Sequence, residues 1–113
     1  MKYSNLVKYL PANSIDSGVS PQRFKLDLNN LTASNLTLES SIVRGLARYL
    51  QAVYDYCEAT NKDRESKNLS PINLIHKDVK KSERGNPIYE YTISVEVNSS
   101  LTFDGVIDPA TEA

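Results

Sequence analysis

The chain has 113 residues, with 13 Lys and Arg against 14 Asp and Glu, and a formal net charge of -1. This length predicts one domain, residues 1–113, and the lone Cys57 excludes a framework of internal disulfides. A chain that wraps nucleic acid needs a basic excess, so nucleic-acid binding here would require a local patch. The sequence contains no signal-like start and no apolar run of membrane-spanning length, which predicts a cytoplasmic protein without a membrane partner.

The first predicted elements are short. A helix is expected over residues 3–10 and is ended by Pro11, and the polar residues 12–22 predict a loop. Residues 23–28 alternate apolar with charged side chains, a period of two that is typical of a half-buried strand. The apolar positions of this strand are Phe24, Leu26 and Leu28.

The strongest pattern in the chain predicts a long amphipathic helix from Leu38 to Thr60. Thr37 is a suitable N-cap, and Glu39 falls in the first turn, where the helix dipole favours a carboxylate. At about 100° per residue, the apolar side chains share one broad face. They are Leu38, Ile42, Leu46, Tyr49, Leu50, Val53, Tyr56 and Cys57.

The second half of the chain predicts strands. Residues 61–70 have no apolar period and are expected to be a solvated connection, and residues 72–81 form a strand with a charged outer part. A turn over residues 83–87 contains Gly85, which can adopt positive φ. A regular strand follows over residues 88–98, and Leu101 and Phe103 suggest a short final strand. Residues 108–113 are expected to be a frayed acidic tail.

Together these patterns predict an α+β fold. One long helix packs on a small, mainly antiparallel sheet of three or four strands, in the order strand-helix-strand-strand, with a short N-terminal helix. Such a sheet has two edges, which proteins usually cover, charge or pair. The lysine-rich second strand is a candidate charged edge, and the first strand is a candidate for pairing across a dimer.

The residue types that perform chemistry are scarce. His76 is the only histidine and falls on a charged strand, while Cys57 falls on the apolar face of the helix, where a thiol behaves as a small hydrophobe. These two residues cannot form a structural zinc set, and the four glycines form no phosphate-binding motif. The sequence therefore identifies no catalytic residue, no metal ligand and no cofactor, and it favours a non-enzymatic role.

Two groups of residues are candidates for binding. Basic side chains gather at the predicted hairpin tip and on the helix. The two arginines of the helix are four residues apart and repel each other, and a bound anion or acidic partner would relieve this repulsion. These binding candidates are Lys77, Lys80, Lys81, Arg84, Arg44 and Arg48. A row of small residues on the helix, Gly45, Ala52 and Ala59, is either incidental or predicts a close approach by another helix, which would be the N-terminal segment of the same chain or a second copy.

Three hypotheses for function follow. The leading one is an interaction or assembly module that is non-enzymatic and homo-oligomeric, with an acidic protein as an alternative partner. The second is a nucleic-acid-associated accessory protein that uses the basic hairpin tip. The third is a small ligand-binding protein or enzyme with a pocket lined by tyrosines: Tyr49, Tyr54, Tyr56, Tyr89 and Tyr91.

Overall fold

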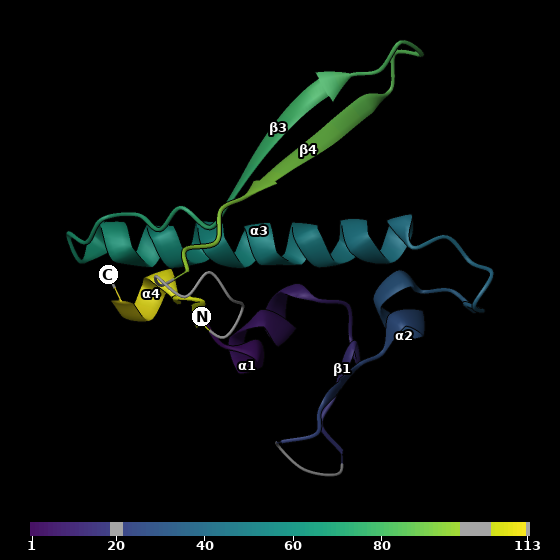
Figure 1. Cartoon of the computed structure of the whole chain (residues 1–113), viewed down its shortest axis with the longest axis horizontal. Coiled ribbons are helices and arrows are strands. Elements are labelled where there is room, and N and C mark those ends of the chain that lie inside the picture. The colour runs from purple at the N-terminus through teal and green to yellow at the C-terminus, as the bar shows by residue number, and fades with distance from the viewer. Residues whose placement is uncertain (19–21, 98–104, 113) are drawn as a thin grey trace. The chain divides into compact units, whose positions relative to one another are not determined.

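The computed structural model describes residues 1–18, 22–97 and 105–112. Its elements are α1 (Tyr3–Leu6), the 3₁₀ helix η1 (Val7–Tyr9), β1 (Ile15–Asp16), β2 (Lys25–Leu26), α2 (Leu28–Thr32), α3 (Val43–Ser66), β3 (Ile75–Lys81), β4 (Pro87–Ile93) and α4 (Pro109–Glu112) (Figure 1). The chain groups into two compact units, one of residues 2–53 and one of Met1 with residues 54–113. Helix α3 contributes residues to both units.

The predicted α+β class is confirmed: the described residues combine one long helix with four strands and a short N-terminal helix. The strands form two separate antiparallel pairs, β1 with β2 and β3 with β4. The predicted strand over residues 23–28 is shorter than expected, because the Asp27 carboxylate accepts the Asn30 N–H at 3.1 Å and caps α2, which begins at the next residue.

The predicted start of the long helix at Leu38 is wrong, since α3 begins at Val43. Residues 37–40 form a turn in which Thr37 and Ser40 exchange hydrogen bonds: the Ser40 N–H donates to the Thr37 carbonyl at 3.0 Å, and the Thr37 N–H donates to Ser40 Oγ at 3.0 Å. Such local bonds from hydroxyl side chains compete with the helix. The Ser41 hydroxyl then accepts the Val43 N–H at 3.2 Å.

The predicted solvated connection over residues 61–70 is wrong for residues 61–66, which complete α3. These residues lack an apolar period, but Lys, Arg and Glu are good helix formers without one. The helix ends where Asn68 adopts a left-handed φ of 58° and the Leu69 N–H donates to the Arg64 carbonyl at 2.8 Å. The extension of α3 beyond residue 60 is therefore explained by helix propensity, and its end is determined by this cap.

Each unit has its own buried side chains. In residues 2–53 they include Leu6, Leu10, Leu31 and Ala52, and in the other unit they include Cys57, Ile72 and Ile75. Cys57 is 1% exposed, in agreement with its predicted position on the apolar face of the helix. Within the described ranges, no helix combines the length and the apolar character needed to cross a bilayer.

The predicted frayed tail is helical over α4. The Asp108 carboxylate accepts the Ala110 N–H at 2.9 Å, and its other oxygen pairs with the Met1 ammonium at 2.6 Å. The short strand predicted at Leu101 and Phe103 lies outside the described residues.

Candidate functional site

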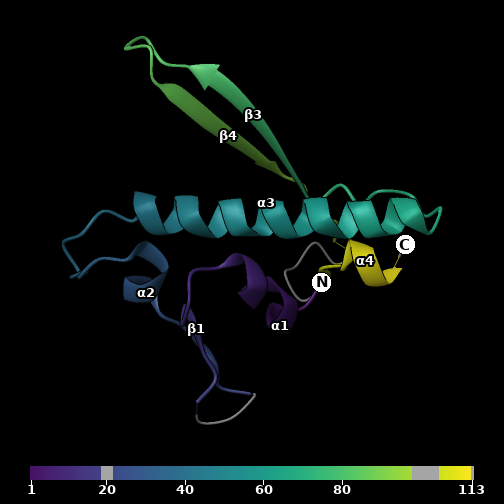
Figure 2. The same ribbon diagram turned by 180° about the vertical axis from the view of Figure 1, so that it is seen from behind.

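Strands β3 and β4 form a two-stranded ribbon, which is visible from both sides of the molecule (Figure 1 and Figure 2). Their register pairs Ile75 with Ile93 at one end and Lys81 with Pro87 at the other. The connecting turn is closed by the Gly85 N–H, which donates to the Ser82 carbonyl at 2.9 Å, and Gly85 has a φ of 81°. Glycine adopts this conformation without the steric cost of a Cβ atom, so the sequence determines the turn locally.

The ribbon has one apolar and one polar face, because cross-strand partners project to the same side. The apolar face carries Ile75, Val79, Pro87, Tyr89, Tyr91 and Ile93, together with Lys77 and Lys81. Of these, Val79, Tyr89 and Ile93 remain 63%, 56% and 48% exposed. An isolated two-stranded hairpin is marginally stable in water and gains from a partner that covers such a face.

The direction of the backbone groups follows from two hydrogen bonds at the ends of the ribbon. The Ser94 N–H donates to the Leu74 carbonyl and the Ser82 N–H to the Asn86 carbonyl, each at 2.8 Å. Since hydrogen-bonded pairs alternate with non-bonded pairs in an antiparallel ladder, the even-numbered residues of β4 face β3. The N–H and C=O groups of Tyr89, Tyr91 and Ile93 therefore point to the outer edge of β4. Among the described strands, β4 pairs with β3 alone.

The two edges of the ribbon differ in charge. Strand β3 contains Lys77, Asp78, Lys80 and Lys81, whereas the one charged residue of β4 is Glu90. Charged side chains on an edge strand oppose pairing with another chain. The predicted charged edge is thus β3, and β4 is the edge that can accept a further strand.

Lys77 lies among three tyrosine rings. Its ammonium nitrogen is 4.2 Å from the ring centroid of Tyr89, 5.7 Å from that of Tyr54 and 5.9 Å from that of Tyr91. Rings of this kind attract a cation through their negative faces. Desolvation by burial, followed by the nearby Asp55 carboxylate, raises the pKa of Tyr91 above its ordinary value of 10.0, which favours the neutral form of this phenol. This cluster connects α3 to both strands of the ribbon.

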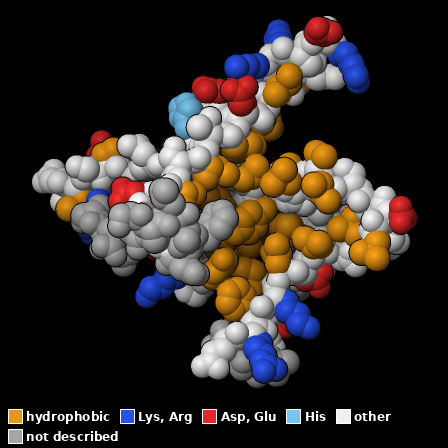
Figure 3. All heavy atoms as spheres, in the orientation of Figure 1, with side chains coloured by type: hydrophobic (Ala, Val, Ile, Leu, Met, Phe, Trp, Pro, Cys, Tyr) orange, Lys and Arg blue, Asp and Glu red, His pale blue; other side chains and the backbone are white. Residues whose placement is uncertain are grey.

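The other predicted basic residues have different surroundings. The Lys80 ammonium pairs with Glu90 at 3.0 Å, while Lys81 and Arg84 are exposed at the tip. Side chains of both charges are crowded at this end of the ribbon (Figure 3). Arg44 and Arg48 are exposed on the part of α3 that belongs to residues 2–53. The structure thus describes the two basic groups in separate units.

The predicted small-residue row is partly covered by the chain itself. A Cβ atom on Gly45 would lie 3.7 Å from Thr32 Cγ2 and 4.0 Å from Leu28 Cδ2, so α2 supplies the close neighbour there. Ala52 is 2% exposed and Ala59 is half-buried. The close neighbour at Gly45 is therefore α2 rather than the predicted N-terminal segment, and an approach by a second copy stays a prediction.

Four of the five tyrosines of the predicted pocket lie in two different groups of side chains, and Tyr56 is half-buried on α3. Tyr54, Tyr89 and Tyr91 meet at Lys77. Tyr49 instead lines a hollow of about 240 Å³ within residues 2–53, together with Tyr3, Ile15, Phe24 and Leu26. His76 is exposed, with its Nε2 3.4 Å from the Asp78 carboxylate. No group of three or more His, Cys, Asp and Glu side chains in the described part of the chain is arranged to hold a metal ion.

Sequence reasoning missed two polar side chains of α3, Asn61 and Arg64. The Asn61 amide accepts the Ile72 N–H at 2.7 Å and donates to the Ile72 carbonyl at 3.1 Å, and Arg64 Nε donates to the Ser70 carbonyl at 2.6 Å. Both lie on the helical period of Cys57 at spacings of four and seven residues. That spacing is the signal that could have placed them on the inner face.

Comparisons of the chain with protein-family models, with curated proteins and with solved structures find no match.

Proposed function

We propose that this protein is a non-enzymatic assembly module that forms a homodimer by pairing the outer edge of β4 with the same edge of a second copy. The observation that carries the proposal is the ribbon itself. Val79, Tyr89 and Ile93 are exposed on its apolar face, and the backbone groups at the outer edge of β4 belong to residues on that face. A strand added there extends the sheet and shields apolar surface at the same time.

The partner that we propose for this edge is a second copy of the chain, because antiparallel pairing of β4 with the same strand of another copy is compatible with a twofold axis. An axis through Glu90 would place two carboxylates directly opposite each other, which is destabilising. An axis through Tyr91 places Tyr89 opposite Ile93 of the partner subunit, and Glu90 opposite Thr92 of the partner subunit. This register uses the outward-facing backbone groups of Tyr89, Tyr91 and Ile93, and it makes a four-stranded sheet in which the apolar faces of both ribbons lie on the same side.

The charge distribution supports protein assembly over nucleic-acid binding. Residues 75–93 contain four Lys and Arg against three Asp and Glu. The phosphate backbone is bound mainly through an excess of cations, and this ribbon offers little. Lys80 is also engaged by Glu90.

The proposal is tested by size-exclusion chromatography with light scattering on the full chain. We expect a mass of twice 12.6 kDa at high concentration. The substitution Tyr89→Pro removes an outward N–H without breaking the hairpin ladder, and it should yield the monomer. Val79→Pro is the matched control, because its N–H points outward at the edge of β3, and this variant should remain dimeric. A strict monomer for the unmodified chain would refute the proposal, as would a dimer that tolerates Tyr89→Pro.

The register has its own test. In a Cys57→Ala background, Tyr91→Cys should form an intersubunit disulfide readily, because Cα atoms across a hydrogen-bonded pair are about 5.5 Å apart, within the range of a disulfide. Thr92→Cys faces Glu90 of the partner subunit instead and should cross-link poorly. Efficient cross-linking of the second variant alone would exclude the axis through Tyr91.

A further inference from the structure

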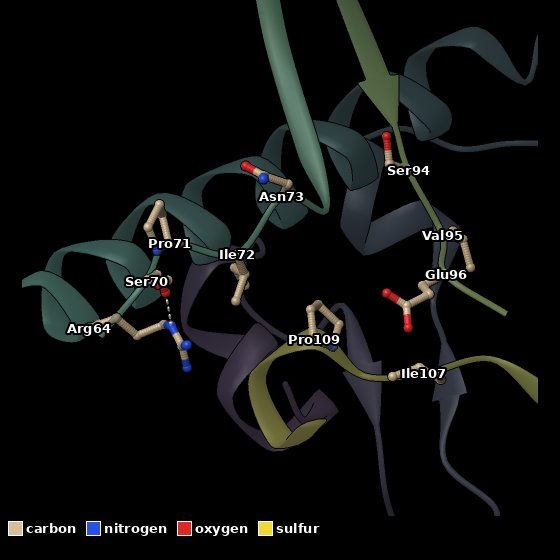
Figure 4. A pocket seen from close by; sticks show the side chains of 10 residues that line it. All are labelled: Arg64, Ser70, Pro71, Ile72, Asn73, Ser94, Val95, Glu96, Ile107 and Pro109. Carbon is tan, nitrogen blue, oxygen red and sulfur yellow. Dashed lines mark hydrogen bonds between the residues drawn. The ribbon is translucent and has the colours of Figure 1, made fainter. Parts of the chain in front are cut away.

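A pocket of about 390 Å³ lies within residues 64–109, away from the edge of β4 (Figure 4). Ile72 and Pro109 line its middle, while Arg64 and Glu96 lie on opposite sides of them, with the Glu96 carboxylate turned toward Pro109. Other lining residues are Ser70, Pro71, Asn73, Ser94, Val95 and Ile107. The pocket therefore has an apolar middle with one cation and one carboxylate at its two ends.

The walls are held in place by specific hydrogen bonds. Arg64 and Asn61 on α3 bind the backbone of Ser70 and Ile72 on one side. On the other side, the Ile107 N–H donates to the Glu96 carbonyl at 2.9 Å. A site whose walls are bonded in this way needs little rearrangement to accept a ligand, which lowers the entropic cost of binding.

The charges at the two ends do not neutralise each other directly. Arg64 is 8% exposed, and within the described residues its side chain makes one hydrogen bond, that of Nε with the Ser70 carbonyl. The ion pairs of the described residues do not join Arg64 to Glu96. A guanidinium has five N–H donors, and a buried cation is costly unless it is paired. The remaining donors of Arg64 are suited to a carboxylate, which a guanidinium binds with two parallel bonds.

We infer that this pocket binds a small aliphatic molecule with a carboxylate at one end and an ammonium at the other. The carboxylate pairs with Arg64 at the buried end, and the ammonium pairs with Glu96, which is exposed at the mouth. The aliphatic chain between them packs on Ile72 and Pro109. Because Arg64 and Glu96 lie on opposite sides of Ile72 and Pro109, the two charged groups belong at opposite ends of the alkyl chain, and the ligand class is an ω-amino acid.

Three related probes test this inference on the full chain: ε-aminocaproate, caproate and n-hexylamine. In amide NMR spectra, ε-aminocaproate should shift the resonances of the pocket residues and bind more tightly than either singly charged compound. Absence of a shift at tens of millimolar ε-aminocaproate would overturn the inference. Equal affinity for all three probes would also overturn it, because binding would then be apolar alone.

A substitution at Glu96 tests the contribution of the carboxylate end of the pocket to ligand binding. Glu96→Gln should weaken ε-aminocaproate about fivefold, the effect of one partly exposed charge pair, and leave caproate unchanged. Glu65→Gln is the matched control: this exposed glutamate of α3 lies outside the pocket and should leave both affinities unchanged. Because the Arg64 side chain also binds the Ser70 carbonyl, its replacement would disturb the structure of residues 67–72. The affinity of the Glu96→Gln variant is therefore the measurement that tests the ligand class. Unchanged affinity of ε-aminocaproate in Glu96→Gln would refute the ω-amino acid.

Discussion

Replacing Asn61 by alanine removes the two hydrogen bonds that hold the backbone of Ile72 against α3, at 2.7 and 3.1 Å. Each neutral hydrogen bond contributes about 1 kcal/mol net, and the partly buried N–H and C=O of Ile72 lose their partners, which adds to the cost. Alanine recovers about 0.5 kcal/mol through its higher helix propensity. The substitution should therefore lower the free energy of unfolding by about 2 kcal/mol.

For a chain of this size, that loss corresponds to a fall in the melting temperature of about 10 °C, which circular dichroism can measure. Asn35→Ala is the control, since Asn35 is exposed and lies outside a helix, and it should change the melting temperature by less than about 2 °C. If Asn61→Ala behaved like this control, the two bonds would not stabilise the fold, and the reasoning from the Asn61 amide would be refuted.

Three further predictions concern the cation cluster, a phenol and two glycines. Lys77→Met should destabilise the protein by about 1 kcal/mol in urea unfolding, because it removes the cation from the tyrosine rings. Lys80→Met, which loses an exposed ion pair, should cost at most about 0.5 kcal/mol, and equal effects would contradict the role of the rings. Burial, followed by a neighbouring phenol, raises the pKa of Tyr49 above 10.0. The resulting stabilisation is complete below pH 10 and is lost as the pH rises through the folded-state pKa. Tyr49→Phe should make unfolding less sensitive to alkali, and an unchanged pH profile would contradict this. Gly85→Ala should destabilise the protein by about 1 kcal/mol, because residue 85 has a positive φ. Gly45→Ala should stabilise the protein by up to about 1 kcal/mol, because alanine favours a helix and the added methyl group meets α2 at ordinary contact distance. Effects of the same sign would be inconsistent with the two backbone conformations.

The fold could be predicted to the extent that it depends on local periodicity. The period of 3.6 residues predicts α3 correctly in type, and the period of two predicts the alternation of Tyr89, Tyr91 and Ile93. The ends of α3 could not be found from this signal. Its start is displaced by the turn over residues 37–40, in which the Ser40 hydroxyl accepts the Thr37 N–H and competes with the helix that the apolar pattern favours.

The candidate sites were harder to predict, because they depend on pairings between distant residues. The sequence identifies Lys77 as basic, but only the register with Tyr91 brings its ammonium to the tyrosine rings. Arg64 lies in a charged stretch that is typical of a solvated segment, and its burial follows from the path of residues 70–72 beside α3. Periodicity contains no information about such contacts.

The length of the turn between β3 and β4 decides which side chains share a face of the ribbon. The turn bonds at Ser82 and Gly85 set a register in which odd-numbered residues face odd-numbered residues. One inserted residue would pair odd with even positions, and Tyr89 would then share a side with Asp78 and Lys80. Two inserted residues would restore the original parity. Natural variants of this chain should therefore change this turn by even numbers of residues, and a single-residue insertion should abolish the amphipathic ribbon while it leaves every side chain in the strands unaltered.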